Sequence, residues 1–87
     1  MAATPSSRNK GFADERYRAL IGRLVEARKE AQLSQGALAT RLQRHQQFVS
    51  RYETGERRLD VVEFMDIAAA LNVDGENLLR TLDKAKS

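Results

Sequence analysis

The chain lacks cysteine altogether, so neither disulfide bonds nor thiolate-bound metal sites can stabilise it. No apolar run approaches the roughly 20 residues that a membrane-spanning helix needs. The N-terminal sequence MAATPSSRNKG also lacks the apolar stretch of a signal peptide. We therefore expect a cytoplasmic protein with no membrane partner.

Residue patterns typical of catalytic, phosphate-binding or metal-binding sites are also missing. His45 is the single histidine, and the chain has no glycine-rich phosphate loop and no group of acidic and histidine residues with metal-ligand spacing. Asp14 and Glu15 are adjacent in sequence, so their carboxylates would not face each other on a helix. We predict that the protein is not an enzyme and has no catalytic residues, no metal site and no cofactor.

The 87 residues suffice for one small domain, near the lower size at which a core sustains itself. Residues 1–58 carry twelve Lys and Arg against six Asp and Glu (+6), whereas residues 59–87 carry three against six (−3), and together they give the net charge of +3. This asymmetry suggests a surface that faces a polyanion such as nucleic acid. Ordinary scatter in a small charged protein can produce the same asymmetry.

Residues 14–31 show the three- and four-residue apolar spacing of an amphipathic helix. The apolar positions of this stripe are Tyr17, Leu20, Ile21, Leu24, Val25 and Ala31. Arg28 falls within the same stripe, where an aliphatic residue is expected. A charged side chain at such a position requires a partner.

Three further helix starts are predicted from capping residues. Ser34, Asp60 and Asp74 each follow an apolar residue and precede another apolar residue four positions later. This is the pattern of an N-cap within a hydrophobic staple, and it places a helix start at the next residue in each case. Asp60 and Glu63 also form a capping-box pattern. Gly55 is suited to end the intervening helix in a left-handed conformation.

These signals predict an all-α fold, a compact bundle of five helices with no alternating strand pattern. The predicted helices span residues 14–31, 35–42, 46–53, 61–71 and 75–84. We expect residues 1–12 to be a flexible N-terminal arm, residues 13–84 to form one domain, and residues 85–87 to be a short tail. The predicted core consists of Leu24, Leu38, Ala39, Leu42, Val49, Tyr52, Val62, Ile67, Leu71 and Leu78.

The helix predicted at residues 46–53 has an unusual polar side. The side chains that fall there, within about 140° of arc at 100° per residue, are Gln46, Gln47, Ser50 and Arg51. Val49 and Tyr52 fall on the opposite side. Flat amide and guanidinium groups form paired hydrogen bonds with planar partners, whereas an ordinary solvated face carries Lys and Glu. With the short helix before it and the tight turn between them, this helix completes a predicted helix-turn-helix at about residues 35–53.

Several short motifs occur together in this region. They are LSQ at 33–35, the small Ala39, QQ at 46–47, Val49, Tyr52, E-x-G at 53–55 and ALNV at 70–73. With these motifs, residues 24–79 resemble the phage repressor/Cro-like helix-turn-helix domains, often called the XRE type. Two positions depart from the family pattern: Gln43 stands where a turn glycine is usual, and His45 stands where Thr or Ser usually caps the third helix. A left-handed Gln43 would cost about 1 kcal/mol.

The resemblance implies a DNA-binding fold and assigns roles to individual residues. In the major groove glutamine pairs with adenine and arginine with guanine, and residues at the start of a recognition helix reach the base edges. The base-reading candidates are His45, Gln46, Gln47, Ser50 and Arg51. The phosphate-binding candidates are Gln35, Arg44, Thr54, Arg57 and Arg58, with Arg41 a weaker one. The family also commonly joins an arginine late in helix one to a glutamate that ends helix three, which implies a structural ion pair between Arg28 and Glu53.

Some residues have two interpretations. Phe48 can contact a thymine methyl group or belong to the core. Arg8 and Lys10 in the N-terminal arm can lie along a minor groove or belong to a disordered terminus. Three leucines of the last predicted helix can form a dimer or toxin-binding face, namely Leu78, Leu79 and Leu82. Burial in the core is the simpler explanation for Leu78 and can also apply to Leu82.

The implied function is that of a sequence-specific double-stranded DNA-binding transcription regulator, a repressor that reads the major groove with helix 46–53. A single domain of this kind buries roughly 600–1,000 Å² of its surface on DNA, so we expect a homodimer on a palindromic operator. One alternative is an antitoxin, which would bind a toxin as well as its own operator. Another is a restriction–modification controller.

Overall fold

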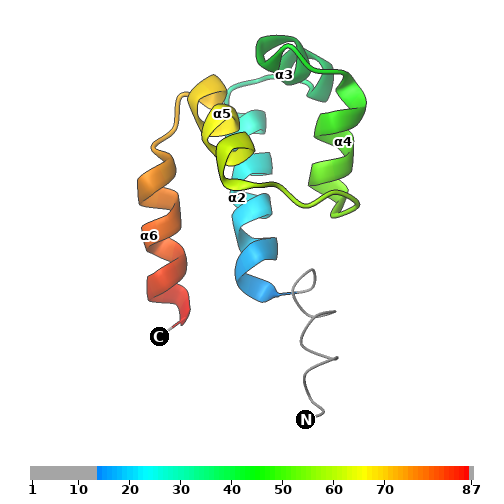
Figure 1. Cartoon of the computed structure of the whole chain (residues 1–87). Coiled ribbons are helices and arrows are strands. Elements are labelled where there is room, and N and C mark those ends of the chain that lie inside the picture. Colours follow the sequence, from blue (N-terminus) through cyan, green and yellow to red (C-terminus); the bar gives the residue numbers. More distant parts are fainter. Residues whose placement is uncertain (1–13, 87) are drawn as a thin grey trace.

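The computed structural model describes residues 14–86, with side chains through Leu82. Within that range it contains five helices and no strand, which confirms the predicted all-α class (Figure 1). The helices are α2 (Glu15–Glu30), α3 (Gln35–Leu42), α4 (Gln46–Thr54), α5 (Val61–Leu71) and α6 (Gly75–Lys86). None of these helices is long and apolar enough to cross a lipid bilayer.

The structure describes the C-terminal end of the chain to Lys86 but not the predicted N-terminal arm. The predicted arm at residues 1–12, with its proposed minor-groove contacts by Arg8 and Lys10, lies outside the described residues. At the other end α6 runs to Lys86, so it includes two residues of the predicted tail. Neither glycine nor proline occurs after Leu82, so the sequence contains no residue that would end the helix earlier.

The helices begin where their capping residues predict. Ser34 and Asp74 each accept a hydrogen bond from the backbone N–H three residues later, at 3.0 and 3.1 Å. Asp60 and Glu63 form a reciprocal capping box, in which each carboxylate accepts from the other residue's backbone N–H, at 2.7 and 3.1 Å. Each cap satisfies a donor that the first helical turn leaves without a partner. Local chemistry therefore sets the helix starts.

Left-handed residues end three of the described helices. Gly55 follows α4 with φ of 91°, Gln43 follows α3 with φ of 57°, and Asn72 follows α5 with φ of 61°. Gln43 thus adopts the conformation for which the family pattern uses glycine, at a cost of about 1 kcal/mol. His45 stands at the N-cap of α4 and makes no side-chain capping bond. The turn between α3 and α4 therefore keeps its geometry without the usual residues.

The two short helices depend on the rest of the molecule. α2 runs through the centre and contacts α4, α5 and α6, while α3 packs against α4 and α5 (Figure 1). α3 and α4 have only 8 and 9 residues, too few to persist alone in water. A shared core holds them in place, and its fully buried side chains are Tyr52, Leu24, Leu38, Ile67 and Val49.

Most of the predicted core is buried, but the prediction for Val62 is wrong, since this residue is 64% exposed. α5 turns the opposite side of its axis inward, through Phe64, Ile67 and Leu71 among others. Leu42 and Leu78 are only partly buried. The prediction also omitted five buried apolar residues, which are Leu20, Ile21, Phe48, Phe64 and Ala68.

Candidate nucleic-acid interface

One side of α4 is open to solvent and carries all the base-reading candidates. The exposed or partly exposed residues there are His45, Gln46, Gln47, Ser50 and Arg51. Arg51 forms a loose ion pair with Glu56, with 3.7 Å between Nε and Oε1, and both side chains are more than half exposed. The guanidinium and the two glutamine amides therefore remain accessible to a planar partner.

The back of α4 is fixed in the core by three buried side chains, Phe48, Val49 and Tyr52. The two aromatic rings lie 5.6 Å apart between centroids and are inclined by 59°. Burial also raises the pKa of the Tyr52 hydroxyl. Phe48 is 9% exposed. Of its two interpretations, the structure therefore supports the one in which it belongs to the core.

The Arg28–Glu53 ion pair ties the end of α4 to α2. Arg28 donates from Nε and Nη2 to the two carboxylate oxygens of Glu53, at 2.8 and 3.1 Å, and from Nη1 to the Leu33 carbonyl at 2.8 Å. Both side chains are nearly buried, at 11% and 7% exposed. The hydrogen bond to Glu53 raises the pKa of Arg28. Because bidentate geometry is the strong form of such a pair, the pair holds α4 at a fixed position on α2.

Gln35, the first residue of α3, has a hydrogen-bond partner within the protein. Its amide Nε2 donates to Glu53 Oε1 at 2.9 Å, so the side chain extends the ion pair, and its phosphate contact stays a prediction. The start of α3 still presents backbone N–H groups, which favour an anion. Gln46 lies across the same end, with its Oε1 only 3.4 Å from the position that a Cβ on Gly36 would take. The starts of α3 and α4 therefore form one polar surface.

Arg44 and Arg57 converge on Glu63, and we call these three residues the Glu63 cluster. Arg57 binds the carboxylate through Nη1 at 2.8 Å and Nη2 at 2.7 Å, and Arg44 binds it through Nη2 at 3.2 Å. Both guanidinium groups also lie against the Phe48 ring. The Cζ atom of Arg44 is 4.1 Å from the ring centroid, and that of Arg57 is 5.0 Å from it. The side chains of Arg44 and Arg57 are nevertheless 43% and 42% exposed, respectively. Two predicted phosphate-binding arginines are thus held in position, while Glu63 offsets one of their two charges.

Glu63 is strongly shifted toward its ionised form. Hydrogen bonds from Arg57, the Asp60 N–H and Arg44 lower the pKa of Glu63 to about 2, from its ordinary value of 4.5. Its side chain is only 10% exposed. Arg57 responds in the opposite sense, because the bond to Glu63 raises the pKa of Arg57.

This shift predicts a specific loss of stability in acid. Because the folded pKa of Glu63 is lowered, its stabilisation is present above about pH 4.5 and is lost as the pH falls toward 2. We expect about 1–2 kcal/mol, since the arginine partners are partly exposed and screened. Urea unfolding between about pH 2.5 and about pH 6 should show that Glu63→Gln loses this part of the pH dependence.

Glu56→Gln serves as the control, because Glu56 is 69% exposed and its contact with Arg51 is loose. This variant should keep the pH profile of the unmodified chain. If Glu63→Gln also kept that profile, the Glu63 cluster would not contribute to stability in solution.

The remaining phosphate candidates differ in what they contact. Arg58 is exposed and lies over the Tyr17 ring, with 4.1 Å between Cζ and the centroid. The Thr54 hydroxyl donates to the Arg51 carbonyl at 3.1 Å and so completes the last turn of α4. Arg41 donates to a carbonyl near the end of α5 at 3.1 Å. Arg58 therefore lies against the start of α2, whereas the two arginines of the Glu63 cluster lie against Phe48 of α4.

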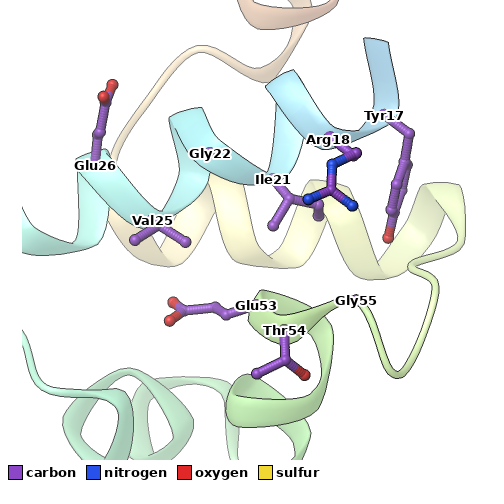
Figure 2. Close-up of a pocket in the computed structure, with 9 residues that line it drawn as sticks. All are labelled: Tyr17, Arg18, Ile21, Gly22, Val25, Glu26, Glu53, Thr54 and Gly55. Carbon is purple, nitrogen blue, oxygen red and sulfur yellow. The ribbon is translucent and has the colours of Figure 1, made fainter. Parts of the chain in front are cut away.

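A hollow of about 450 Å³ lies between α2 and the end of α4 (Figure 2). Ile21 and Val25 point into it from α2, and the Glu53 carboxylate extends beneath Val25 from the other side. None of the base-reading candidates is among the described residues that line it. The hollow thus adjoins the ion pair that supports α4 and is separate from the base-reading side.

Sequence reasoning missed the roles of Glu63 and Tyr17. Glu63 was identified only as a capping residue, although its carboxylate also holds two arginines from other segments. Tyr17 supports Arg58 with its ring and accepts a hydrogen bond from the Leu59 N–H at 3.0 Å. This contact joins residues far apart in sequence, so no local pattern could have found it.

Comparisons with known proteins agree with this geometry. Residues 19–82 match a family model described as a helix-turn-helix domain. Among solved structures, the chain is similar to an XRE-family like protein from Pseudomonas syringae pv. tomato str. DC3000, at 42% sequence identity and a TM-score of 0.83, with 100% of each chain covered. No curated protein matches the chain.

Proposed function

The chain belongs to the XRE family of helix-turn-helix proteins, and from that premise we propose that it is a sequence-specific repressor that reads the major groove with α4. Membership of the family makes it a DNA-binding transcription regulator in general terms. Proteins of this fold are typically not enzymes, and we propose no catalytic role. The cytoplasm, where operator DNA lies, is the corresponding location.

The open side of α4 is the observation that carries the proposal. Val49 and Tyr52 are fully buried behind it, and the Arg28–Glu53 pair anchors its end. The helix is therefore a rigid support for the side chains at its start. Glutamine matches the paired donor and acceptor of adenine, and arginine matches the paired acceptors of guanine. We propose that His45, Gln46, Gln47, Ser50 and Arg51 read base edges.

Phosphate contacts flank the reading side in this proposal. Arg44 and Arg57 lie against Phe48 of α4, Arg58 follows Arg57 in the same loop, and all three are exposed or partly exposed. A guanidinium that donates two bonds to Glu63 keeps further N–H donors for a phosphate. The N–H groups at the start of α3 supply another contact. The hydroxyl of Thr54 and the amide of Gln35 have partners within the protein, so their phosphate roles would require those bonds to be exchanged.

Selection from a random pool of DNA duplexes tests the proposal most directly. The purified full chain should enrich a common sequence, and a footprint on that sequence should show protected bases in the major groove. Enrichment that stays at the level of unrelated duplexes, at every salt concentration tried, would contradict sequence-specific recognition.

Arg51 provides the sharpest test of base reading. Arg51→Ala should lose about 1–3 kcal/mol of discrimination at one or two base pairs of the selected site, because a bidentate contact to guanine is removed. Competition binding with single base-pair variants of the selected duplex measures this loss.

Arg51→Lys is the matched control for charge. It keeps the positive charge but lacks the planar fork, so it should bind unrelated duplexes as the unmodified chain does and still lose discrimination. If Arg51→Lys retained full discrimination, a simple charge contact would explain Arg51 and the base-reading role would be wrong.

A homodimer on a palindromic operator is part of the proposal, because one domain buries too little DNA surface for useful specificity by itself. The half-sites would lie about one helical turn apart.

The antitoxin alternative is favoured by one feature, the exposed Leu79 on α6 (48%), which can serve a protein partner. A toxin encoded beside this chain, and a stable complex between the two purified proteins, would support that alternative.

A further inference from the structure

Glu63 joins two arginines that lie on either side of α4 in the chain. Arg44 precedes α4 and Arg57 follows it, whereas Glu63 belongs to the first turn of α5. One oxygen of its carboxylate accepts from Arg57 Nη1 at 2.8 Å, and the other lies 2.7 Å from Arg57 Nη2 and 3.2 Å from Arg44 Nη2. A single carboxylate thus holds one guanidinium from the segment before α4 and one from the segment after it.

The Glu63 carboxylate is itself fixed. It also accepts from the backbone N–H of Asp60 at 3.1 Å, within the capping box of α5, and its side chain is only 10% exposed. On the other side, the buried ring of Phe48 supports both guanidinium groups. The two arginines are therefore held between a rigid acceptor and a rigid ring.

This arrangement leaves both arginines able to contact a phosphate but limits their charge. Arg57 uses two of its five N–H donors on the carboxylate and Arg44 uses one. The two arginines (+2) and the carboxylate (−1) together carry a charge of +1. A free arginine can follow a phosphate on any duplex, since its long side chain has many rotamers. A held arginine meets only a phosphate that lies at its fixed position.

We infer that Glu63 is a positioning residue that makes DNA binding by this chain selective. The inference rests on the proposed function, because it concerns the phosphate contacts of Arg44 and Arg57. On the selected sequence, base contacts from α4 set the register of the protein, and both held arginines then meet phosphates with little further loss of side-chain freedom. On an unrelated duplex no such register is set. There Glu63 keeps the two arginines from following the nearest phosphates and offsets part of their attraction.

Glu63→Gln tests the inference, because it removes the charge and keeps the length of the side chain. Glutamine also serves at this position of a capping box. We expect binding to unrelated duplexes to be about 5-fold tighter at physiological salt, and the slope of log affinity against log salt to steepen by about 0.9, the value for one further phosphate contact. Affinity for the selected duplex should change by less than about 2-fold, because the lost positioning offsets the gained charge.

Glu63→Asp separates position from charge. It keeps the carboxylate charge but is shorter by one CH₂ group, about 1.5 Å, and therefore cannot hold both arginines. We expect unrelated duplexes to bind with unchanged affinity and salt slope, and the selected duplex to bind about 5-fold more weakly. If this variant kept the selectivity of the unmodified chain, charge alone would act and the positioning role would be wrong.

Glu76→Gln is the control for net charge. It removes the same charge from α6, where the side chain is 81% exposed and which lies across α2 from α4 (Figure 1), so it should keep the selectivity of the unmodified chain. A purely structural role for Glu63 would lower the folded fraction and weaken binding to both duplexes by the same factor. An unchanged ratio of the two affinities in Glu63→Gln would therefore overturn the inference.

NMR relaxation of the arginine Nε–H groups tests the positioning without DNA. We expect those of Arg44 and Arg57 to be ordered in the unmodified chain and more mobile in both Glu63 variants, while that of Arg80, whose side chain is 64% exposed, stays the same. Equal mobility of Arg44 and Arg57 in all three proteins would overturn the inference. Failure of the unmodified chain to enrich any sequence would instead contradict the proposed function, and the mobility of the two arginines would still show whether Glu63 positions them.

Discussion

Replacing Glu53 with alanine is expected to lower the free energy of unfolding by about 3–5 kcal/mol, because it leaves the nearly buried Arg28 without its charge partner. Gln35 loses the acceptor of its amide in the same variant. A domain of this size has only about 5–15 kcal/mol of stability in total. The melting temperature should therefore fall by roughly 15–30 °C, which thermal and urea unfolding followed by circular dichroism will measure.

Two further variants separate charge loss from simple truncation. Glu56→Ala removes an exposed carboxylate just beyond α4 (69% exposed), and its stability should change by less than about 0.5 kcal/mol. Arg28→Met combined with Glu53→Met removes both charges and should be more stable than Glu53→Ala, because no buried charge is left unpaired. If the double variant were the less stable of the two, the loss in Glu53→Ala could not come from an unpaired Arg28.

The helix starts could be predicted because their causes are local. The side chains of Ser34, Asp60 and Asp74 each accept a hydrogen bond from the backbone N–H three residues later. Such a short separation can be recognised from the sequence alone. Apolar periodicity likewise located α2. The same argument fails for Val62, because a helix that is apolar on every side does not show in sequence which side faces inward. Only packing against α2, α3 and α6 determines how α5 is rotated.

The candidate site was only partly predictable for the same reason. The open side of α4 follows from helical geometry alone, and Arg28 stood out as a charge in an apolar stripe. The identity of its partner came from the family resemblance and not from spacing. The Glu63 cluster could not be predicted, because a carboxylate that caps one helix also binds Arg44, 19 residues away. Tertiary contacts thus decide which arginines are held in place and how much of their charge is offset.

Replacing Arg57 and Arg58 together with alanine is expected to weaken binding to the selected duplex and to unrelated duplexes alike, by roughly 10- to 100-fold at physiological salt. Both residues precede α5 in the loop that follows α4, and in the proposal both contact phosphates. Each contact contributes about 0.9 to the slope of log affinity against log salt, so the slope should fall by about 1.8. Titrations at several salt concentrations will give both values.

The control for this variant must lose the same net charge elsewhere. Arg23→Ala with Arg80→Ala removes two charges from α2 and α6, since Arg23 donates to Thr81 of α6 at 2.7 Å and the Arg80 side chain is 64% exposed. α6 and α4 lie on opposite sides of α2 (Figure 1), so the salt slope of this control should stay close to that of the unmodified chain. Since Arg57 also binds Glu63, unfolding curves must first show that both double variants are folded at the binding temperature. If the two variants then weakened DNA binding equally, net charge alone would account for the effect, and the loop before α5 would not be a phosphate contact.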